Sequence, residues 1–140
     1  MGFGAAVQSA FKKTFNYQGR ASRSEYWWFY LFYLLSFTAL ITVFMVILGI
    51  ASDHNRTNDS VNPMFGALGL LGFLYLLAML VVQLPLSIRR LHDSGKSGFF
   101  LLLTFVPFGG IVLLVFFCLP GTNGANQYGD DPIRPLAGVF

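Results

Sequence analysis

Apolar residues along the chain fall into three long runs that short polar segments separate. The first two runs, at about residues 27–51 and 65–88, contain no charged side chain. Each is longer than the roughly 20 residues that a helix needs to cross the hydrocarbon core of a bilayer. The pattern therefore predicts two membrane-spanning helices.

The third apolar run, at 99–119, is interrupted by "PFGG" at 107–110. Its total length favours one kinked crossing. The alternative is a re-entrant hairpin, which lipid tolerates only where the bared backbone is satisfied by the protein. We expect a single crossing, and hence a small all-α bundle with about three transmembrane spans that forms one membrane domain over residues 1–140.

Polar segments flank these runs. Residues 1–18 predict an amphipathic helical arm, which either lies in the membrane interface or packs on the rest of the protein. Residues 120–140 form a tail rich in Gly, Pro and Asn, which is typical of turns. The arm's apolar side chains at helical spacing are Phe3, Val7, Ala10, Phe11 and Phe15.

Helix ends are marked by capping residues. Ser22 and Glu25 have the S-x-x-E spacing of a capping box, in which each side chain bonds a free amide of the first turn. Gly95 is placed to end the second span, and Ser97 is placed to cap the helix that follows. Trp27 and Trp28 at the start of the first span are typical of an aromatic belt at the bilayer surface.

Composition agrees with a membrane location. Hydrophobic residues make up 55% of the chain and charged residues only 11%, whereas a soluble domain carries about 25% charge. The net charge of +3 comes from scattered basic residues, so a contiguous nucleic-acid-binding face is not expected. The single cysteine, Cys118, excludes an intrachain disulfide and is expected to be a small buried apolar residue.

Basic residues indicate the orientation of the spans. The segment before the first span carries four of them, and the loop after the second span carries three, whereas the loop between the two spans has only Arg56. The positive-inside rule therefore places the N-terminus and the loop at 89–98 in the cytoplasm.

The loop "RRLHDSGKSG" at 89–98 contains residue types that occur in catalytic and phosphate-binding sites. It is not a phosphate-binding loop, because Arg90 stands where that motif needs glycine and no strand precedes it. His92 and Asp93 are too few to hold a metal, because the other histidine, His54, is expected on the opposite side of the membrane. We therefore expect no metal, no cofactor and no catalytic residue.

Three interpretations of the charged residues on this side are open. In the first, they only fix the orientation of the spans in the membrane. In the second, they form ion pairs that hold the spans together, with Glu25 against Arg89 or Arg90 and Asp93 against Arg20 or Arg23. In the third, the arginines bind an anionic lipid headgroup or another phosphate. The candidate residues are Arg20, Arg23, Glu25, Arg89, Arg90, His92, Asp93 and Lys96.

A second candidate set lies within the second span. Gly66, Gly69 and Gly72 recur every three residues and would allow a neighbouring helix to approach closely. Gln83 is the strongest polar side chain inside a span, and we expect it to make an interhelical hydrogen bond.

Three stretches together carry a family resemblance: "GRASRSEYWWF" at 19–29, "RRLHDSGKSGFF" at 89–100 and "PGTNGANQYGDDP" at 120–132. In this order they resemble the bacterial inner-membrane proteins of domain of unknown function 805, the YhaH/YhaI-like proteins. The resemblance implies a small, multi-span, all-helical protein of the bacterial cytoplasmic membrane. It implies no activity, and therefore no catalytic residue.

The leading functional hypothesis is a non-enzymatic membrane protein whose charged residues pack the helices at the cytoplasmic face and bind anionic lipid headgroups. An oligomeric small transporter or pore is the alternative; it requires self-association, because three short spans cannot enclose a pathway. A headgroup-modifying enzyme using His92 and Asp93 as acid and base is a third hypothesis, weakened by the lack of a recognised nucleophile.

Overall fold

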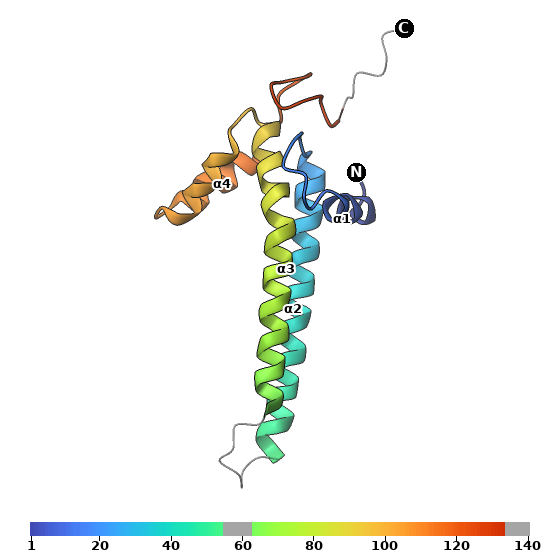
Figure 1. Ribbon diagram of the computed structural model, residues 1–140, viewed down its shortest axis with the longest axis vertical. Helices are drawn as coiled ribbons and strands as arrows, with labels where there is room; N and C mark the ends of the chain where they lie inside the picture. The colour runs from blue at the N-terminus through green and yellow to red at the C-terminus, as the bar shows by residue number, and fades with distance from the viewer. Residues whose placement is uncertain (55–62, 134–140) are drawn as a thin grey trace. The chain divides into compact units, whose positions relative to one another are not determined.

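The computed structural model describes residues 1–54 and 63–133, with the side chains of 1–50 and 66–133. Most of the expected loop at 52–62 and the end of the tail therefore lie outside the described residues. The elements are α1 (Phe3–Lys12), α2 (Arg23–His54), α3 (Pro63–Asp93), the 3-10 helix η1 (Gly98–Phe105) and α4 (Gly109–Cys118) (Figure 1). No β-strand occurs among these residues, so the all-α prediction is confirmed.

The first two predicted spans are helices. Within α2 and α3, the segments Arg23–Ile50 and Gly66–Asp93 are long and apolar enough to cross a membrane. Both helices begin and end a few residues beyond the apolar runs at 27–51 and 65–88. Charged residues at the ends of both helices therefore lie in regular helix, and their side chains follow helical spacing.

The start of α2 is set by half of the expected capping box. The Ser22 hydroxyl oxygen accepts a hydrogen bond from the Glu25 backbone N–H at 3.2 Å, as predicted. The reciprocal bond from the cap amide to Glu25 is replaced. The Glu25 carboxylate instead accepts from Ser9 of α1 and from Arg89 of α3, because these stronger partners lie within reach.

The end of α3 is set by glycine. Gly95 has φ +71°, a left-handed conformation that glycine adopts without steric cost. The Gly95 N–H donates to His92 O and the Lys96 N–H donates to Leu91 O, at 3.0 and 2.9 Å. These two bonds form a Schellman motif. The Ser97 side chain then caps η1 by accepting from the Phe99 N–H, as predicted.

The chain divides into two compact units, each built from parts of α2 and α3. One unit contains Met1–Tyr30 and the chain from Val81 onward, and the other contains Leu31–Leu80. In the second unit α2 and α3 lie side by side (Figure 1), and the Ser36 hydroxyl and the Tyr75 hydroxyl are 2.5 Å apart. Most apolar side chains of this unit are exposed, which suits a lipid-facing surface.

In the first unit, α1 packs on the beginning of α2. The Phe3 ring meets Trp28 edge-on at 5.9 Å between centroids, and Phe11 meets Phe29 at 5.8 Å. Ala6 and Ala10 of α1 are fully buried. The expected arm is thus a helix shorter than residues 1–18, and its contacts are those of an arm packed on the protein; a membrane-interface location is not confirmed.

The third apolar run differs from the expected single crossing. It is divided between η1 and α4, and Phe108, with φ 64°, lies in the turn between them. The Phe100 and Phe116 rings are in edge contact at 5.6 Å, and the Lys96 ammonium lies 4.4 Å from the Phe116 centroid. A continuous helix would separate Phe100 from Phe116 by roughly 24 Å. The chain therefore turns back at "PFGG".

This turn also changes the expected environment of Cys118. The cysteine at the end of α4 is exposed, not buried as its apolar neighbours suggested. A hairpin of two short helices has too little interior to cover every apolar side chain.

Candidate functional site

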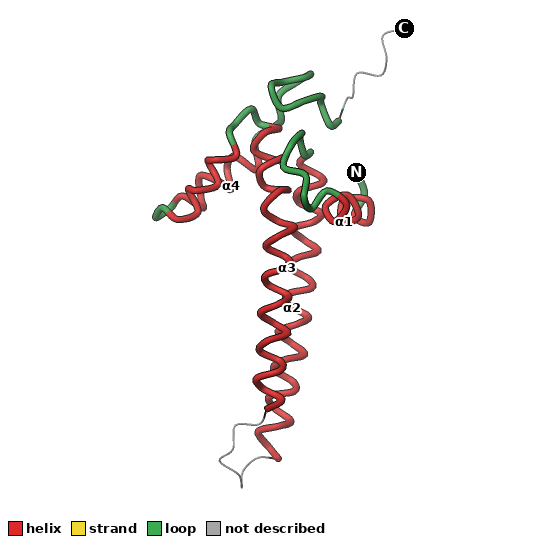
Figure 2. Tube along the Cα trace, in the orientation of Figure 1, coloured by secondary structure: helices red, strands yellow, loops and turns green. Residues whose placement is uncertain are grey.

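Loops gather at the end of α3 in the first unit (Figure 2). Beside them lies a group of buried charged side chains. Asp93, in the last turn of α3, is its centre. The Asp93 Oδ1 accepts from Arg20 at 2.9 Å, and its Oδ2 accepts from Arg90 Nη1 at 2.5 Å. All three side chains are almost fully buried. One carboxylate therefore holds two guanidinium groups, one from the segment before α2 and one from α3.

The remaining N–H groups of these two arginines bind backbone carbonyls. Arg20 donates to Thr122 O at 2.6 Å and to Gly124 O at 2.5 Å. Arg90 donates to Phe117 O at 3.2 Å and also to Leu119 O. Each arginine thus ties the C-terminal segment to the same aspartate.

The backbone of the tail approaches Asp93 very closely at Gly121. A Cβ atom built on Gly121 would lie 2.3 Å from the Asp93 Oδ2, a distance that real Cβ atoms do not show. The Thr122 N–H also donates to the Asp93 backbone carbonyl at 2.8 Å. Glycine is therefore required at 121 because any side chain would occupy the space of the carboxylate.

A second buried ion pair joins α2 to α3. The Glu25 Oε1 accepts from the Ser9 hydroxyl at 2.8 Å and lies 3.5 Å from Arg89 Nη1. Within the described part of the chain, the Arg89 Nε and Nη2 have no hydrogen-bond partner, although Arg89 is only 2% exposed. Buried donors without acceptors are costly, so these two nitrogens mark the least satisfied part of the site.

His92 and Asp93 are held by different groups. The His92 ring stacks on Tyr128 with 3.9 Å between ring centroids, and its Nδ1 lies 3.3 Å from Gly19 O. Asn126 donates to the His92 backbone carbonyl at 3.0 Å. The imidazole thus packs against the tail, while the neighbouring carboxylate is engaged by two arginines.

Of the eight charged candidates, the structure joins five in buried ion pairs: Arg20, Glu25, Arg89, Arg90 and Asp93, here called the polar cluster. Among the expected alternatives, it forms Glu25–Arg89 and Asp93–Arg20. Arg23 is exposed and outside these pairs. Lys96 lies over the Phe116 ring, in cation–π geometry.

Several partners of the polar cluster were not expected from sequence. Ser9 reaches Glu25 from α1, and the acceptors for Arg20 and Arg90 are main-chain carbonyls of the tail. Backbone carbonyls carry no sequence signal, because every residue has one. The available signal was the tail stretch "PGTNGANQYGDDP", which meets the other two motif stretches once the chain turns back.

The second candidate set divides between the two units, with Gln83 in the first and the three glycines in the second. Gln83 lies 3.5 Å from the Tyr26 hydroxyl through its amide nitrogen, which links α3 to α2. Gly69 and Gly72 line an apolar groove of about 260 Å³ between Phe37, Phe44 and Leu76 in the second unit. A Cβ at Gly66, Gly69 or Gly72 would meet no atom of the described residues within 4 Å, so none of the described segments approaches these glycines closely.

Two helices that are long and apolar enough to span a membrane, with mostly exposed apolar side chains, are typical of a helical membrane protein. The family described as "Protein of unknown function (DUF805)" matches residues 14–130, and the chain belongs to this family. The resemblance stated from the three motif stretches is therefore confirmed.

Two relatives from Escherichia coli strain K12 agree with this assignment. The chain is 45% identical to the inner membrane protein YhaI over 125 residues, which cover 89% of this chain and 92% of that relative. It is 32% identical to the inner membrane protein YhaH over 122 residues, which cover 86% and 90%. No solved structure matches the chain.

Proposed function

We propose that this chain is a non-enzymatic protein of the bacterial inner membrane whose polar cluster locks the helices together at the cytoplasmic face and binds an anionic lipid headgroup. The names of YhaI and YhaH support the location. In this arrangement α2 and α3 cross the bilayer. The basic residues before α2 and after α3 support a cytoplasmic N-terminus.

The observation that carries the proposal is the set of Arg89 hydrogen-bond donors that lack an acceptor. Asp93 is shared by Arg20 and Arg90, and Glu25 pairs with Arg89 through Nη1 alone. Among the described residues, the Arg89 Nε and Nη2 have no hydrogen-bond partner. Phosphate oxygens would supply the missing acceptors, and guanidinium groups bind phosphate with paired hydrogen bonds.

The absence of enzymatic activity is part of the proposal. An acid–base pair needs its groups directed at one reacting atom. His92 stacks on Tyr128, and the Asp93 carboxylate is engaged by Arg20 and Arg90. This arrangement favours structural roles for both residues.

Anionic lipid is expected to raise the thermal unfolding midpoint of the purified protein, and substitution of Arg89 with glutamine is expected to abolish most of that rise. The probe is phosphatidylglycerol added to phosphatidylcholine nanodiscs. A ligand at 100 times its dissociation constant stabilises the folded state by about 2.7 kcal/mol. The rise is expected to depend on Arg89 because its Nε and Nη2 are the donors that the phosphate oxygens of the headgroup would accept from.

The control is Lys13→Ala, which removes one exposed positive charge outside the polar cluster. Its response to phosphatidylglycerol is expected to match that of the unmodified protein. Equal responses from Arg89→Gln and the unmodified protein would mean that the lipid acts by general attraction to basic residues, and the binding role of Arg89 would be wrong.

A second candidate function is that of an oligomeric small transporter or pore. The apolar groove beside Gly69 and Gly72 favours it, because the open space at both glycines allows a helix of a second copy to enter. Cysteines placed at Gly69 in two differently tagged copies are expected to cross-link in native membranes. A monomer in mild detergent, with no cross-link in the membrane, would exclude this candidate.

A further inference from the structure

The η1–α4 hairpin, residues 98–119, is an uncharged stretch with both ends fixed at the polar cluster. At its beginning Ser97 caps η1 directly after the Schellman motif of α3. At its end Arg90 binds Phe117 O and Leu119 O. The hairpin thus leaves and rejoins the protein at the same end of α3.

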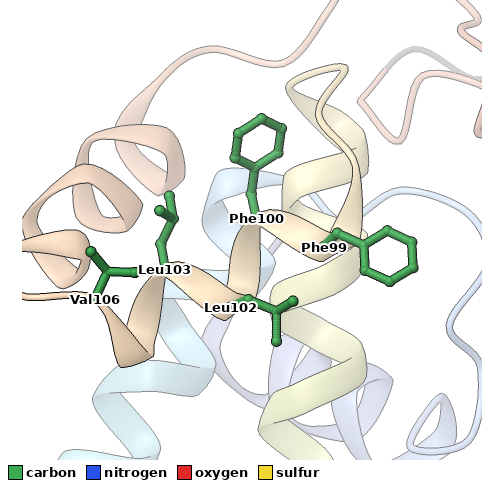
Figure 3. Close-up of a pocket in the computed structure, with 5 residues that line it drawn as sticks. All are labelled: Phe99, Phe100, Leu102, Leu103 and Val106. Atoms are coloured by element: carbon green, nitrogen blue, oxygen red, sulfur yellow. The ribbon is translucent and has the colours of Figure 1, made fainter.

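The outer surface of the hairpin is strongly apolar. Phe99, Phe105 and Phe108 are 80%, 85% and 81% exposed. In a 3-10 helix, side chains three positions apart lie on the same side, so Phe99 shares one side of η1 with Leu102 and Phe100 shares another with Leu103 (Figure 3). These side chains line an apolar hollow of about 270 Å³ on η1. An apolar surface of this kind marks an interaction site.

The turn of the hairpin satisfies much of its own backbone. The Val106 N–H donates to Leu103 O, the Gly109 N–H to Val106 O, and the Ile111 N–H to Phe108 O, at 2.9–3.0 Å. Pro107 has no N–H to satisfy. A non-helical turn needs such bonds where no water is present, because bared backbone groups cost several kcal/mol in hydrocarbon.

The only hydroxyl group in the hairpin is also satisfied internally. Thr104 donates to Leu101 O at 2.8 Å. This hydroxyl therefore needs no water as a hydrogen-bond acceptor.

The length of the hairpin suits one leaflet. The ten residues of α4 rise about 15 Å, which is half of the roughly 30 Å hydrocarbon core. We propose that η1 and α4 form a re-entrant hairpin that enters the leaflet nearest the polar cluster and returns without crossing, with lipid acyl chains covering its outer surface and the hollow on η1. This inference rests on the proposed membrane location of the chain.

The experiment uses the full-length protein in native membranes, with Cys118 replaced by alanine and single cysteines introduced at Phe105, Ile111, Asn123 or Lys13. A charged, membrane-impermeant maleimide is applied to vesicles of either orientation. Cysteines at Asn123 and Lys13 are expected to react from the same face. Cysteines at Phe105 and Ile111 are expected to react at least about tenfold more slowly, because acyl chains shield them from a charged reagent.

Lipid contact is measured directly in reconstituted vesicles. An environment-sensitive fluorophore on the cysteine at Phe105 or Ile111 is expected to be quenched by phospholipids that carry a spin label on the acyl chain. The fluorophore at Asn123 is expected to be quenched much less. Two hairpin positions are used so that local disturbance at one does not decide the result.

Three outcomes would overturn the inference. Reaction of Asn123 from the face opposite to Lys13 would mean that the run crosses the bilayer. Rapid labelling of Phe105 and Ile111 in intact membranes would mean that water covers the hairpin. Shielding without quenching by spin-labelled lipid would mean that protein covers it. None of these outcomes depends on headgroup binding by Arg89, which the nanodisc experiment tests separately.

Discussion

Replacing Asp93 with asparagine is expected to lower the free energy of unfolding by about 3–5 kcal/mol, the cost of removing one partner from a buried ion pair. Asp93 forms ion pairs with both Arg20 and Arg90. Asparagine keeps the size of the side chain but removes its charge, so two buried guanidinium groups would lose their counter-ion. The measurement is the unfolding midpoint in mild detergent.

Asp130→Asn provides the matched control. Asp130 is exposed, and its substitution changes the net charge of the chain by the same amount. We expect it to leave the unfolding midpoint nearly unchanged. Equal midpoints for the two variants would show that the ion pairs of Asp93 contribute no more than a surface charge.

The same carboxylate can be displaced without removing its charge. Gly121→Ala would place a methyl group 2.3 Å from the Asp93 Oδ2, so the tail must move away from α3. This variant is expected to reproduce part of the loss seen with Asp93→Asn. Combining the two substitutions should cost less than the sum of their separate effects, because they disrupt the same contact.

Replacing Gly109 with alanine is expected to open the η1–α4 hairpin. A Cβ at this position would lie 1.9 Å from the backbone oxygen of Leu103, which cannot rotate away as a side chain can. Overpacking typically costs about 1–3 kcal/mol, and a clash with main chain lies at the upper end. The measurements are the unfolding midpoint in mild detergent and the cross-linking of cysteines placed at Phe100 and Phe116.

Gly110→Ala is the control for this variant. A Cβ on Gly110 would meet no atom within 4 Å, and alanine favours helix more than glycine does. We expect the cross-link between residues 100 and 116 to form in Gly110→Ala and to be lost in Gly109→Ala. A cross-link of equal yield in both variants would contradict the need for glycine at 109, and its absence from Gly110→Ala would contradict the folded-back geometry of the third apolar run.

Local features of the fold were predictable because they depend on neighbouring residues. The lengths of the apolar runs predicted α2 and α3 to within a few residues at each end. Ser22, Gly95 and Ser97 were predicted as helix caps, and each does cap a helix end. These features follow from hydrophobic length and from backbone groups that a nearby side chain or a glycine must satisfy.

The course of the third apolar run was not predictable in this way. The 21-residue run at 99–119 suits one crossing by length, and "PFGG" is compatible with either a kink or a turn. The choice depends on Leu103 packing against Gly109 and on Phe100 meeting Phe116, which are contacts between segments. No local pattern expresses such contacts.

The choice of partners within the polar cluster was equally open. Arg20 and Arg23 lie three residues apart and carry the same charge, yet only Arg20 is buried against Asp93. The carbonyls of Thr122 and Gly124 that complete its hydrogen bonds become available only when the tail returns to the end of α3.

By itself, the sequence determined the apolar helices, their caps, the residues able to form buried ion pairs and membership of the family. These properties depend on composition and on spacing along the chain. Only the tertiary structure decided that the third run folds back, that the tail joins the polar cluster and that Arg89 keeps unpartnered donors. The physical reason is that burial and pairing are properties of surrounding space, which distant segments of the chain create together.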